Sequence, residues 1–317
     1  IMAIFQTKKI QSFIVFIIVL AAILWIFQDN ILNISVFKKT TEVSELSEEQ
    51  IKDTPYLEKI DNFIIKEYSS DQVLLHTIEA DVYKSFKDSP VQLEIVTVTT
   101  FDEKQNETLT LTSDRAVIFK SGSIHFIGEV EIKTLSGISH EIDTELLVVK
   151  GDQIKSNRDV FYLGESAKIK AQGLDMNTKS DLVNLNGDVE ILQDSGATLT
   201  TKNLLISHGS GEKRYESKEK TVYKSNENIV NADRGVDINM KTEQTKLLGD
   251  VTVINGFGSS LTSYDLIIDQ SNDGEIFKSN SPTRFQSNTV DIKAKKMHYD
   301  AIAKKLKLTD EVKATYE

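Results

Sequence analysis

The sequence is poor in the residue types that carry most enzyme chemistry. Its 317 residues include no cysteine, which excludes disulfide bonds, thiolate metal sites and a cysteine nucleophile. Only five histidines occur, at positions 76, 125, 140, 208 and 298, and none makes a ligand pair at helical or hairpin spacing. A P-loop, a Rossmann glycine string and a G-x-S-x-G motif are also missing from the sequence. We therefore expect no metal, no cofactor and no catalytic residue.

Basic residues are fewer than acidic residues in this chain. Lysine and arginine total 37 against 48 aspartates and glutamates, and the net charge of -11 argues against a nucleic-acid partner, which would need a basic face. The many carboxylates suit solvated strand faces, although two of them brought together by the fold would make the catalytic pair of a glycosidase. The single tryptophan, Trp25, lies in an apolar N-terminal segment, so the rest of the chain has no tryptophan on which a sugar ring could stack.

One long apolar run stands near the start of the sequence. Residues 10–27 read IQSFIVFIIVLAAILWIF, and at about 1.5 Å per residue this length spans the hydrocarbon core of a bilayer. Lys8 and Lys9 precede the run and Trp25 lies near its other end. The pattern predicts a retained transmembrane helix with residues 1–9 in the cytoplasm and the rest outside. A cleaved signal peptide is the alternative, but no A-x-A site follows the run.

The rest of the chain alternates between apolar and polar residues with period two. Residues 28–56 are polar and predict a tether. Beyond Tyr56, short runs rich in Val, Ile, Thr and Phe are separated by Gly, Asn, Asp and Ser, which indicates an all-β, antiparallel body without helices. Among the expected strands are TLTLTS (108–113) and AVIF (116–119), taken as two separate runs.

A phrase of nine residues recurs along this body. It reads VNLNGDVEI at 183, IHFIGEVEI at 124, TKLLGDVTV at 245 and, more weakly, LKLTDEVKA at 306, so that its central column recurs at intervals of 59 to 62 residues. Such recurrence predicts stacked β repeats of about 60 residues that share a core. Asn186-Gly187 alone would suggest a hairpin turn. Because Ile127 and Leu248 take the place of Asn186 in other copies, the column is better interpreted as a bulge or bend inside a strand.

Apolar residues within each phrase share one parity, so they face one side of a sheet. Two interpretations remain open: an apolar trough that holds lipid chains, and a dry sandwich core. The predicted trough residues are Leu109, Leu111, Ile118, Ile124, Phe126, Val130, Ile132, Val183, Leu185, Val189, Ile191, Leu247, Val251, Val253, Leu308 and Val312.

The chain also resembles a known family. The resemblance rests on two stretches after the apolar segment, NFIIKEYSSDQVLLHTIEADVY (62–83) and TLTLTSDRAVIFKSGSIHFIGEVEI (108–132). They are similar to LptC, the inner-membrane-anchored periplasmic component of the lipopolysaccharide export machine. The repeats from about residue 137 resemble the soluble bridge module of the same superfamily, LptA or OstA-like. The resemblance implies a twisted, boat-shaped β-jellyroll, with an LptC-like part at 57–135 and LptA/OstA-like repeats at 136–317 that continue it.

The resemblance further implies a function without catalysis. Such a protein, anchored in the inner membrane with its bulk in the periplasm, would accept lipopolysaccharide by its lipid A part from an ABC transporter. It would then pass the lipid along the trough to an LptA-like bridge protein. Modules of the family join through open sheet edges, for which Leu306, Leu308, Val312 and Tyr316 are the predicted docking residues. Arg115, Lys120 and Lys133 are candidates to contact phosphate at the rim. A structural, membrane-anchored scaffold with a dry core is the alternative function.

Overall fold

The structure is a computed structural model. It describes residues 56–135, 141–151, 153–163, 167–177, 182–194, 196–207, 214–225, 228–239, 241–255, 258–271 and 275–316. The expected cytoplasmic segment, the transmembrane helix and all but the last residue of the tether lie outside these ranges. Within them, no helix is long and apolar enough to cross a membrane.

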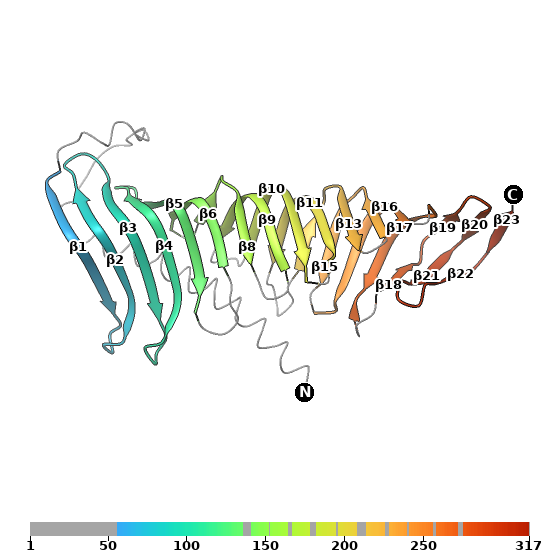
Figure 1. Ribbon diagram of the computed structural model, residues 1–317, viewed down its shortest axis with the longest axis horizontal. Coiled ribbons are helices and arrows are strands. Elements are labelled where there is room, and N and C mark those ends of the chain that lie inside the picture. The colour runs from blue at the N-terminus through green and yellow to red at the C-terminus, as the bar shows by residue number, and fades with distance from the viewer. Residues whose placement is uncertain are drawn as a thin grey trace. The chain divides into compact units, whose positions relative to one another are not determined.

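The described residues form an all-β body, as the alternation predicts. They contain 23 strands and no α-helix, and every strand pairing that the structure gives for them is antiparallel (Figure 1). The chain divides into two compact units. The first comprises residues 1–165 and 173–180, and the second comprises residues 166–172 and 181–317. The expected boundary between residues 135 and 136 stays a prediction.

Unit 1 is built mainly from long strands that follow one another as a meander, each paired with the next. The last long strand then pairs with two short ones: residues 148–150 with β7 and residues 141–144 with β8. The strands are β1 (Glu58–Tyr68), β2 (Leu74–Ser85), β3 (Val91–Phe101), β4 (Glu107–Ile118), β5 (Ser123–Thr134), β6 (Glu141–Lys150), β7 (Gln153–Ser156), β8 (Val160–Leu163) and part of β9 (Ala167–Asn177).

One expectation in this unit is wrong. The runs at 108–113 and 116–119 are not separate strands, because residues 107–118 form the single strand β4. Its pairing with β5 shifts between Thr112 and Arg115, where the strand bends. The polar residues Ser113 and Asp114, which look like a turn in the sequence, therefore occupy a bend within a continuous strand.

Unit 2 repeats an alternation of long hairpins and short strands. Its strands are β10 (Leu182–Gln193), β11 (Thr198–Ser207), β12 (Arg214–Ser217), β13 (Thr221–Ser225), β14 (Asn228–Ala232), β15 (Val236–Asn239), β16 (Gln244–Asn255), β17 (Ser260–Asp269), β18 (Ile276–Ser279), β19 (Thr283–Gln286), β20 (Val290–Ala294), β21 (Lys296–Asp300), β22 (Lys305–Thr309) and β23 (Lys313–Tyr316), together with residues 167–172 of β9.

The short strands divide unit 2 into two half-ladders. Half-ladder A passes from β11 through β12 and β15 to the first half of β16, and from the second half of β17 through β18 and β21 to β22. Half-ladder B passes from β11 through β13 and β14 to the second half of β16, and from the first half of β17 through β19 and β20 to β23. The long strands belong to both half-ladders.

The recurring glycine marks the point where a long strand passes from one half-ladder to the other. Register shifts occur between Leu185 and Asp188 and between Leu247 and Asp250, at the predicted column. Gly187 and Gly249 have φ of 72° and 83°. This is the left-handed conformation, which glycine adopts readily and residues with a Cβ adopt at a cost in energy. The interpretation of the phrase as a bulge rather than a hairpin turn agrees with this geometry. Leu185 and Val189 both remain buried, so the apolar parity continues across the bulge.

Candidate functional site

Nearly all the predicted trough residues lie in the interior. Phe126 and Leu247 are completely buried, at 0% exposure each. The other buried members are Leu109, Leu111, Ile118, Ile124, Val130, Ile132, Val183, Leu185, Val189, Ile191, Val251 and Val253. Leu308 is half-buried and Val312 is exposed. The alternation therefore identified the inward face correctly, while whether that face binds lipid stays a prediction.

Unit 2 contains an apolar pocket between its two half-ladders. The cavity has a volume of about 280 Å³. From half-ladder A it is lined by Phe277, Met297 and Leu306, and from half-ladder B by Phe285 and Asn228. Val253 and Leu261 belong to the strands that both half-ladders share. A predicted trough residue, Val253, and a predicted docking residue, Leu306, thus meet at one cavity.

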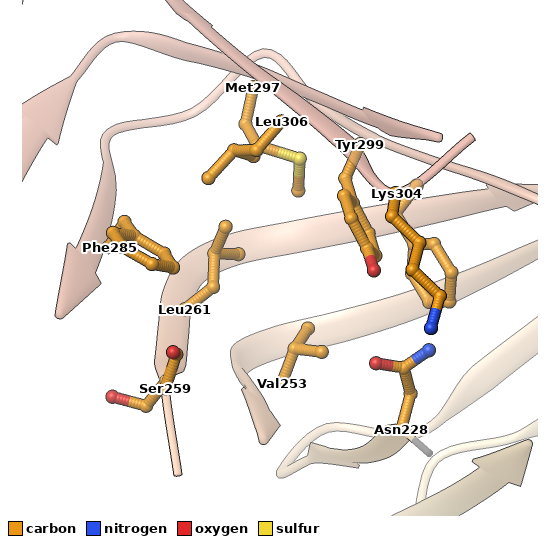
Figure 2. Close-up of a pocket in the computed structure, with 11 residues that line it drawn as sticks. Asn228, Val253, Ser259, Leu261, Phe285, Met297, Tyr299, Lys304 and Leu306 are labelled. Carbon is orange, nitrogen blue, oxygen red and sulfur yellow. The ribbon is translucent and has the colours of Figure 1, made fainter. Parts of the chain in front are cut away.

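The pocket has an apolar body and a polar side. Figure 2 shows Met297, Leu306, Leu261 and Phe285 gathered around the space, whereas Lys304 and Asn228 place their polar groups together at another side of it. Ser259, Ser260 and Tyr299 complete the lining, and the Tyr299 ring lies 5.8 Å from the Phe277 ring between centroids. An apolar cavity with a few polar groups on one side is the usual form of a small-molecule site.

The predicted docking residues lie on the last two strands, except Val312, which lies between them. β22 pairs with β21 and β23 pairs with β20, and the described residues place no strand on the other edge of either. Leu306 and Leu308 are half-buried on β22, while Val312 and Tyr316 are exposed. An exposed row of backbone groups with apolar side chains is a template for strand addition.

Buried hydroxyl groups form clusters that the sequence analysis did not recognise. In one cluster the Oγ atoms of Thr201 and Ser217 are 2.9 Å apart, and the Oγ1 atoms of Thr201 and Thr221 are also 2.9 Å apart. In the next repeat Ser263, Ser279 and Thr283 make the same arrangement, and unit 1 has the pair Thr144–Ser156. The recurrence of S-x-x-x-T at 217–221 and 279–283 was the available signal. These hydroxyls satisfy one another where a long strand meets two short ones, so their role is structural.

A polar bridge also joins the two half-ladders of unit 2. The hydroxyls of Tyr223 and Ser225, in half-ladder B, both donate to Oε1 of Glu275, at 2.9 and 2.8 Å. Glu275 directly precedes β18 of half-ladder A. Burial and the nearby carboxylate raise the pKa of Tyr223, so its hydroxyl stays protonated as a donor. Sequence alone gave no sign of this bridge because its members are about 50 residues apart.

The basic residues proposed for phosphate contact have protein partners. Lys133 forms ion pairs with Glu131 and Glu141, the latter at 3.8 Å. Lys120 donates to the carbonyl oxygen of Lys87 at 3.4 Å. Glu131 and Glu141 also lie within 4.8 Å of Asp143, counting one carboxylate oxygen from each, which makes this surface acidic. The phosphate role of these residues is untested and gains no support from this geometry.

His76 is buried, unlike the other two histidines that the structure describes. It lies on β2 at 1% exposure, and burial lowers its pKa to about 4. The carboxylate of Glu67, on the neighbouring β1, is 3.0 Å from its Nε2 and opposes this effect by favouring the protonated ring. Burial dominates because the ring is almost fully removed from solvent. His125 is half-buried and His298 is exposed.

Comparison with known proteins places these observations in a family. The family described as "Lipopolysaccharide-assembly, LptC-related" matches residues 14–194 and 214–317, which is most of the chain. Members of this family are components of lipopolysaccharide transport, and the family is not a known enzyme family. They are in general anchored in the inner membrane.

Two curated proteins match a shorter stretch. Endopolygalacturonase 1 of Colletotrichum lindemuthianum is 26% identical over 136 residues, which cover 43% of this chain and 36% of that protein. Endopolygalacturonase B of Emericella nidulans is 28% identical over 136 residues, which cover 43% of this chain and 35% of that protein. The chain thus spans about a third of the length of these relatives. The family match is far more extensive: this chain belongs to the LptC-related family of lipopolysaccharide-assembly proteins.

Proposed function

We propose that the protein is a membrane-anchored bridge component. It accepts lipopolysaccharide from an ATP-driven extractor in the inner membrane and passes it along its apolar interior toward the outer membrane. The observation that carries the proposal is the apolar pocket between the half-ladders of unit 2, in a chain whose family assembles lipopolysaccharide. No catalytic step is needed, because the energy for extraction comes from the partner.

The pocket suits the end of an acyl chain. Its volume of about 280 Å³ and its lining by Leu261, Met297 and Phe285 favour methylene groups, each of which contributes about 0.8 kcal/mol when it leaves water. Lys304 and Asn228 lie together on the polar side of the pocket. This places a positive charge and an amide where the polar head of a lipid would emerge.

The proposal assigns the chain parts as follows. Residues 10–27 form the anchor, residues 28–56 the tether, and the β body the conduit, a twisted jellyroll of repeats with the bulk in the periplasm. The lipid A part of lipopolysaccharide is the ligand. The partners are the inner-membrane ABC complex and a periplasmic LptA-like bridge protein, which docks on the β22–β23 edge.

A dry-core scaffold remains the second candidate, and one observation favours it. Phe126 and Leu247 have no exposed surface at all, so side chains must separate before an acyl chain can reach them. In the conduit mechanism this separation accompanies transport. In the scaffold mechanism it never occurs.

Photocrosslinking in cells that carry out transport tests the proposal. A photoreactive residue placed at Leu261 or at Met297 is expected to capture lipopolysaccharide. A photoreactive residue at Phe126 is expected to capture it only while the extractor hydrolyses ATP. Tyr264 is the matched control because it lies on β17 like Leu261 but is 44% exposed. If Tyr264 captures as much lipid as Leu261, or if all four positions capture none, the conduit is refuted and the scaffold stands.

A further inference from the structure

The apolar pocket of unit 2 has one charged end. Lys304 is the only charged residue among the described residues that line it, and the others are apolar or neutral. Figure 2 shows the ammonium group of Lys304 next to the side-chain amide of Asn228, whereas Met297, Leu261 and Phe285 lie away from them. A space that is polar at one end and apolar over the rest matches a molecule with a polar head and an apolar tail.

Asn228 is a buried polar residue whose side chain is aimed into this pocket. It is only 7% exposed, and its amide faces the space beside Lys304 (Figure 2). No other described residue forms a hydrogen bond with this side chain. Buried amides are nearly always hydrogen-bonded, because a polar group removed from water without a partner destabilises the fold. The amide of Asn228 is therefore placed to bond a ligand atom in the pocket.

The bridge at Glu275 holds this end of the pocket in position. Tyr223 and Ser225 lie on β13, which pairs with β14, the strand that begins at Asn228. Their hydroxyls both donate to Oε1 of Glu275, which directly precedes β18 of the other half-ladder. Two donors on one oxygen also offset the negative charge of this carboxylate, which would otherwise oppose an anion nearby. The polar end is thus preformed, as is usual for a ligand site.

The donors and the volume of the pocket select the class of ligand. The hydroxyl of Tyr299 extends toward the same end as the Asn228 amide and the Lys304 ammonium group (Figure 2). A positive charge with neutral donors beside it suits the oxygen of a carboxylate or phosphate. The cavity volume of about 280 Å³ lies just below the roughly 300–1,000 Å³ of sites for drug-sized molecules. Such a space holds one alkyl chain rather than several chains side by side.

We propose that this pocket binds a single-chain anionic amphiphile of the fatty-acid class. The alkyl chain lies against Leu261, Met297 and Leu306, and the anionic head accepts hydrogen bonds from Asn228 and Lys304. The proposal rests on the pocket that the proposed function also uses, but it does not rest on transport, because this ligand enters without the extractor and without ATP. It assigns to the pocket a ligand class other than lipopolysaccharide.

NMR of the methionine methyl groups tests whether the pocket is the binding site. The full chain, isotope-labelled at its methionine methyl groups and embedded in phosphatidylcholine nanodiscs, is titrated with dodecanoate. Met297 lines the pocket, whereas Met176 lies on β9 outside it, and both are 4% exposed, so Met176 is the matched control. We expect a saturable shift of the Met297 signal and no shift of the Met176 signal.

The comparison of dodecanoate with dodecanol, which has the same chain and a neutral head, tests recognition of the anion. Asn228→Leu is expected to weaken dodecanoate binding about 10- to 150-fold, the range for one hydrogen bond to a charged group. Lys304→Met should weaken it about 2- to 5-fold, because Lys304 is open to solvent. Asn228→Leu should weaken dodecanol binding less, and Lys304→Met should leave it unchanged. Lys305→Met is the matched control, since Lys305 is equally exposed but does not line the pocket.

The outcomes decide both the site and the ligand class. No shift of the Met297 signal, or equal shifts of the Met297 and Met176 signals, refutes the pocket as the site. Equal losses for dodecanoate and dodecanol in Lys304→Met, or an equal loss of dodecanoate binding in Lys305→Met, refutes recognition of the anion. Lys304 is exposed, so Lys304→Met keeps the test decisive if circular dichroism shows that Asn228→Leu has unfolded the chain.

The same measurements separate this proposal from the lipid conduit. The expected shift of the Met297 signal, together with no capture of lipopolysaccharide at Leu261, refutes the conduit and supports the single-chain ligand. Capture of lipopolysaccharide at Leu261, together with no shift of the Met297 signal by dodecanoate, refutes the single-chain ligand and supports the conduit.

Discussion

The bulge at Gly249 offers the sharpest test of how the repeats are held together. A Cβ atom at this position would lie 2.0 Å from Oδ1 of Asp233 and 2.6 Å from Cγ of Arg234. Oδ1 of Asp233 also accepts the N–H of Asp250 at 2.7 Å. Gly249→Ala would therefore strain the backbone and displace the side chain that satisfies the next amide.

The expected cost has two parts. A left-handed φ costs alanine about 1–2 kcal/mol. Loss of the hydrogen bond between the Asp233 carboxylate and the Asp250 N–H adds about 1.5–3 kcal/mol. The sum for Gly249→Ala is about 2.5–5 kcal/mol, which for a unit of this size corresponds to a fall in Tm of roughly 5–20 °C.

Gly258→Ala is the matched control. Gly258 has a φ of 80°, but a Cβ there meets nothing within 4 Å. It should therefore cost only the backbone part, about 1–2 kcal/mol. Unfolding is best followed by circular dichroism in urea, because the single tryptophan lies at position 25, outside the β body. Two transitions are to be fitted if the two units unfold separately.

The comparison can refute the reasoning. Equal losses for the two alanine variants would mean that crowding at Asp233 contributes nothing. A loss for Gly249→Ala that Asp233→Ala does not partly reproduce would mean that the amide of Asp250 is satisfied in some other way.

Three further predictions concern protons and hydroxyls. The hydrogen bond from Lys278 lowers the pKa of Asp269 to about 2, so the stability that this pair gives is present above pH 4 and is lost as the pH falls toward 2. In Asp269→Asn the urea midpoint should therefore depend less on pH across that range. A pH profile like that of the unsubstituted chain would contradict the pairing. Burial lowers the pKa of His76 to about 4, so between pH 4 and 6.5 the unfolded chain binds more protons than the folded chain. The free energy of unfolding should therefore fall as the pH drops through that range. A ring pKa near 6.5, measured by NMR titration, would overturn this prediction. Ser217→Ala should cost more than Thr221→Val, about 1–3 against about 1 kcal/mol by thermal unfolding, because Ser217 donates to the Lys202 carbonyl at 2.6 Å and also accepts the Glu219 N–H. Equal costs would show that the cluster is not organised around Ser217.

The match to two endopolygalacturonases raises the glycosidase alternative again. It covers 136 residues and about a third of each enzyme. The closest carboxylates in the described residues include Glu131 and Glu141, and Lys133 pairs with both of them. The family match, to residues 14–194 and 214–317, is far more extensive, and it is to components of transport rather than to a known enzyme family.

The inward face was readable from the sequence because strand alternation is a local property. Residues such as Phe126 and Leu247 are assigned to the interior by parity alone. The bulge, where Leu248 and Gly249 lie opposite the single residue Asp265, leaves that parity unchanged along β16. The all-β class and the bend at the glycine column follow from the same local signals. The sequence by itself thus determined the class, the repeat and the buried face.

The tertiary structure decided what lies across the interior. Tyr223 and Glu275 are 52 residues apart, and the pocket collects residues from Asn228 to Leu306, so neither follows from local alternation. Pairing between distant strands is a non-local interaction, so only the tertiary structure shows which residues face one another across the interior.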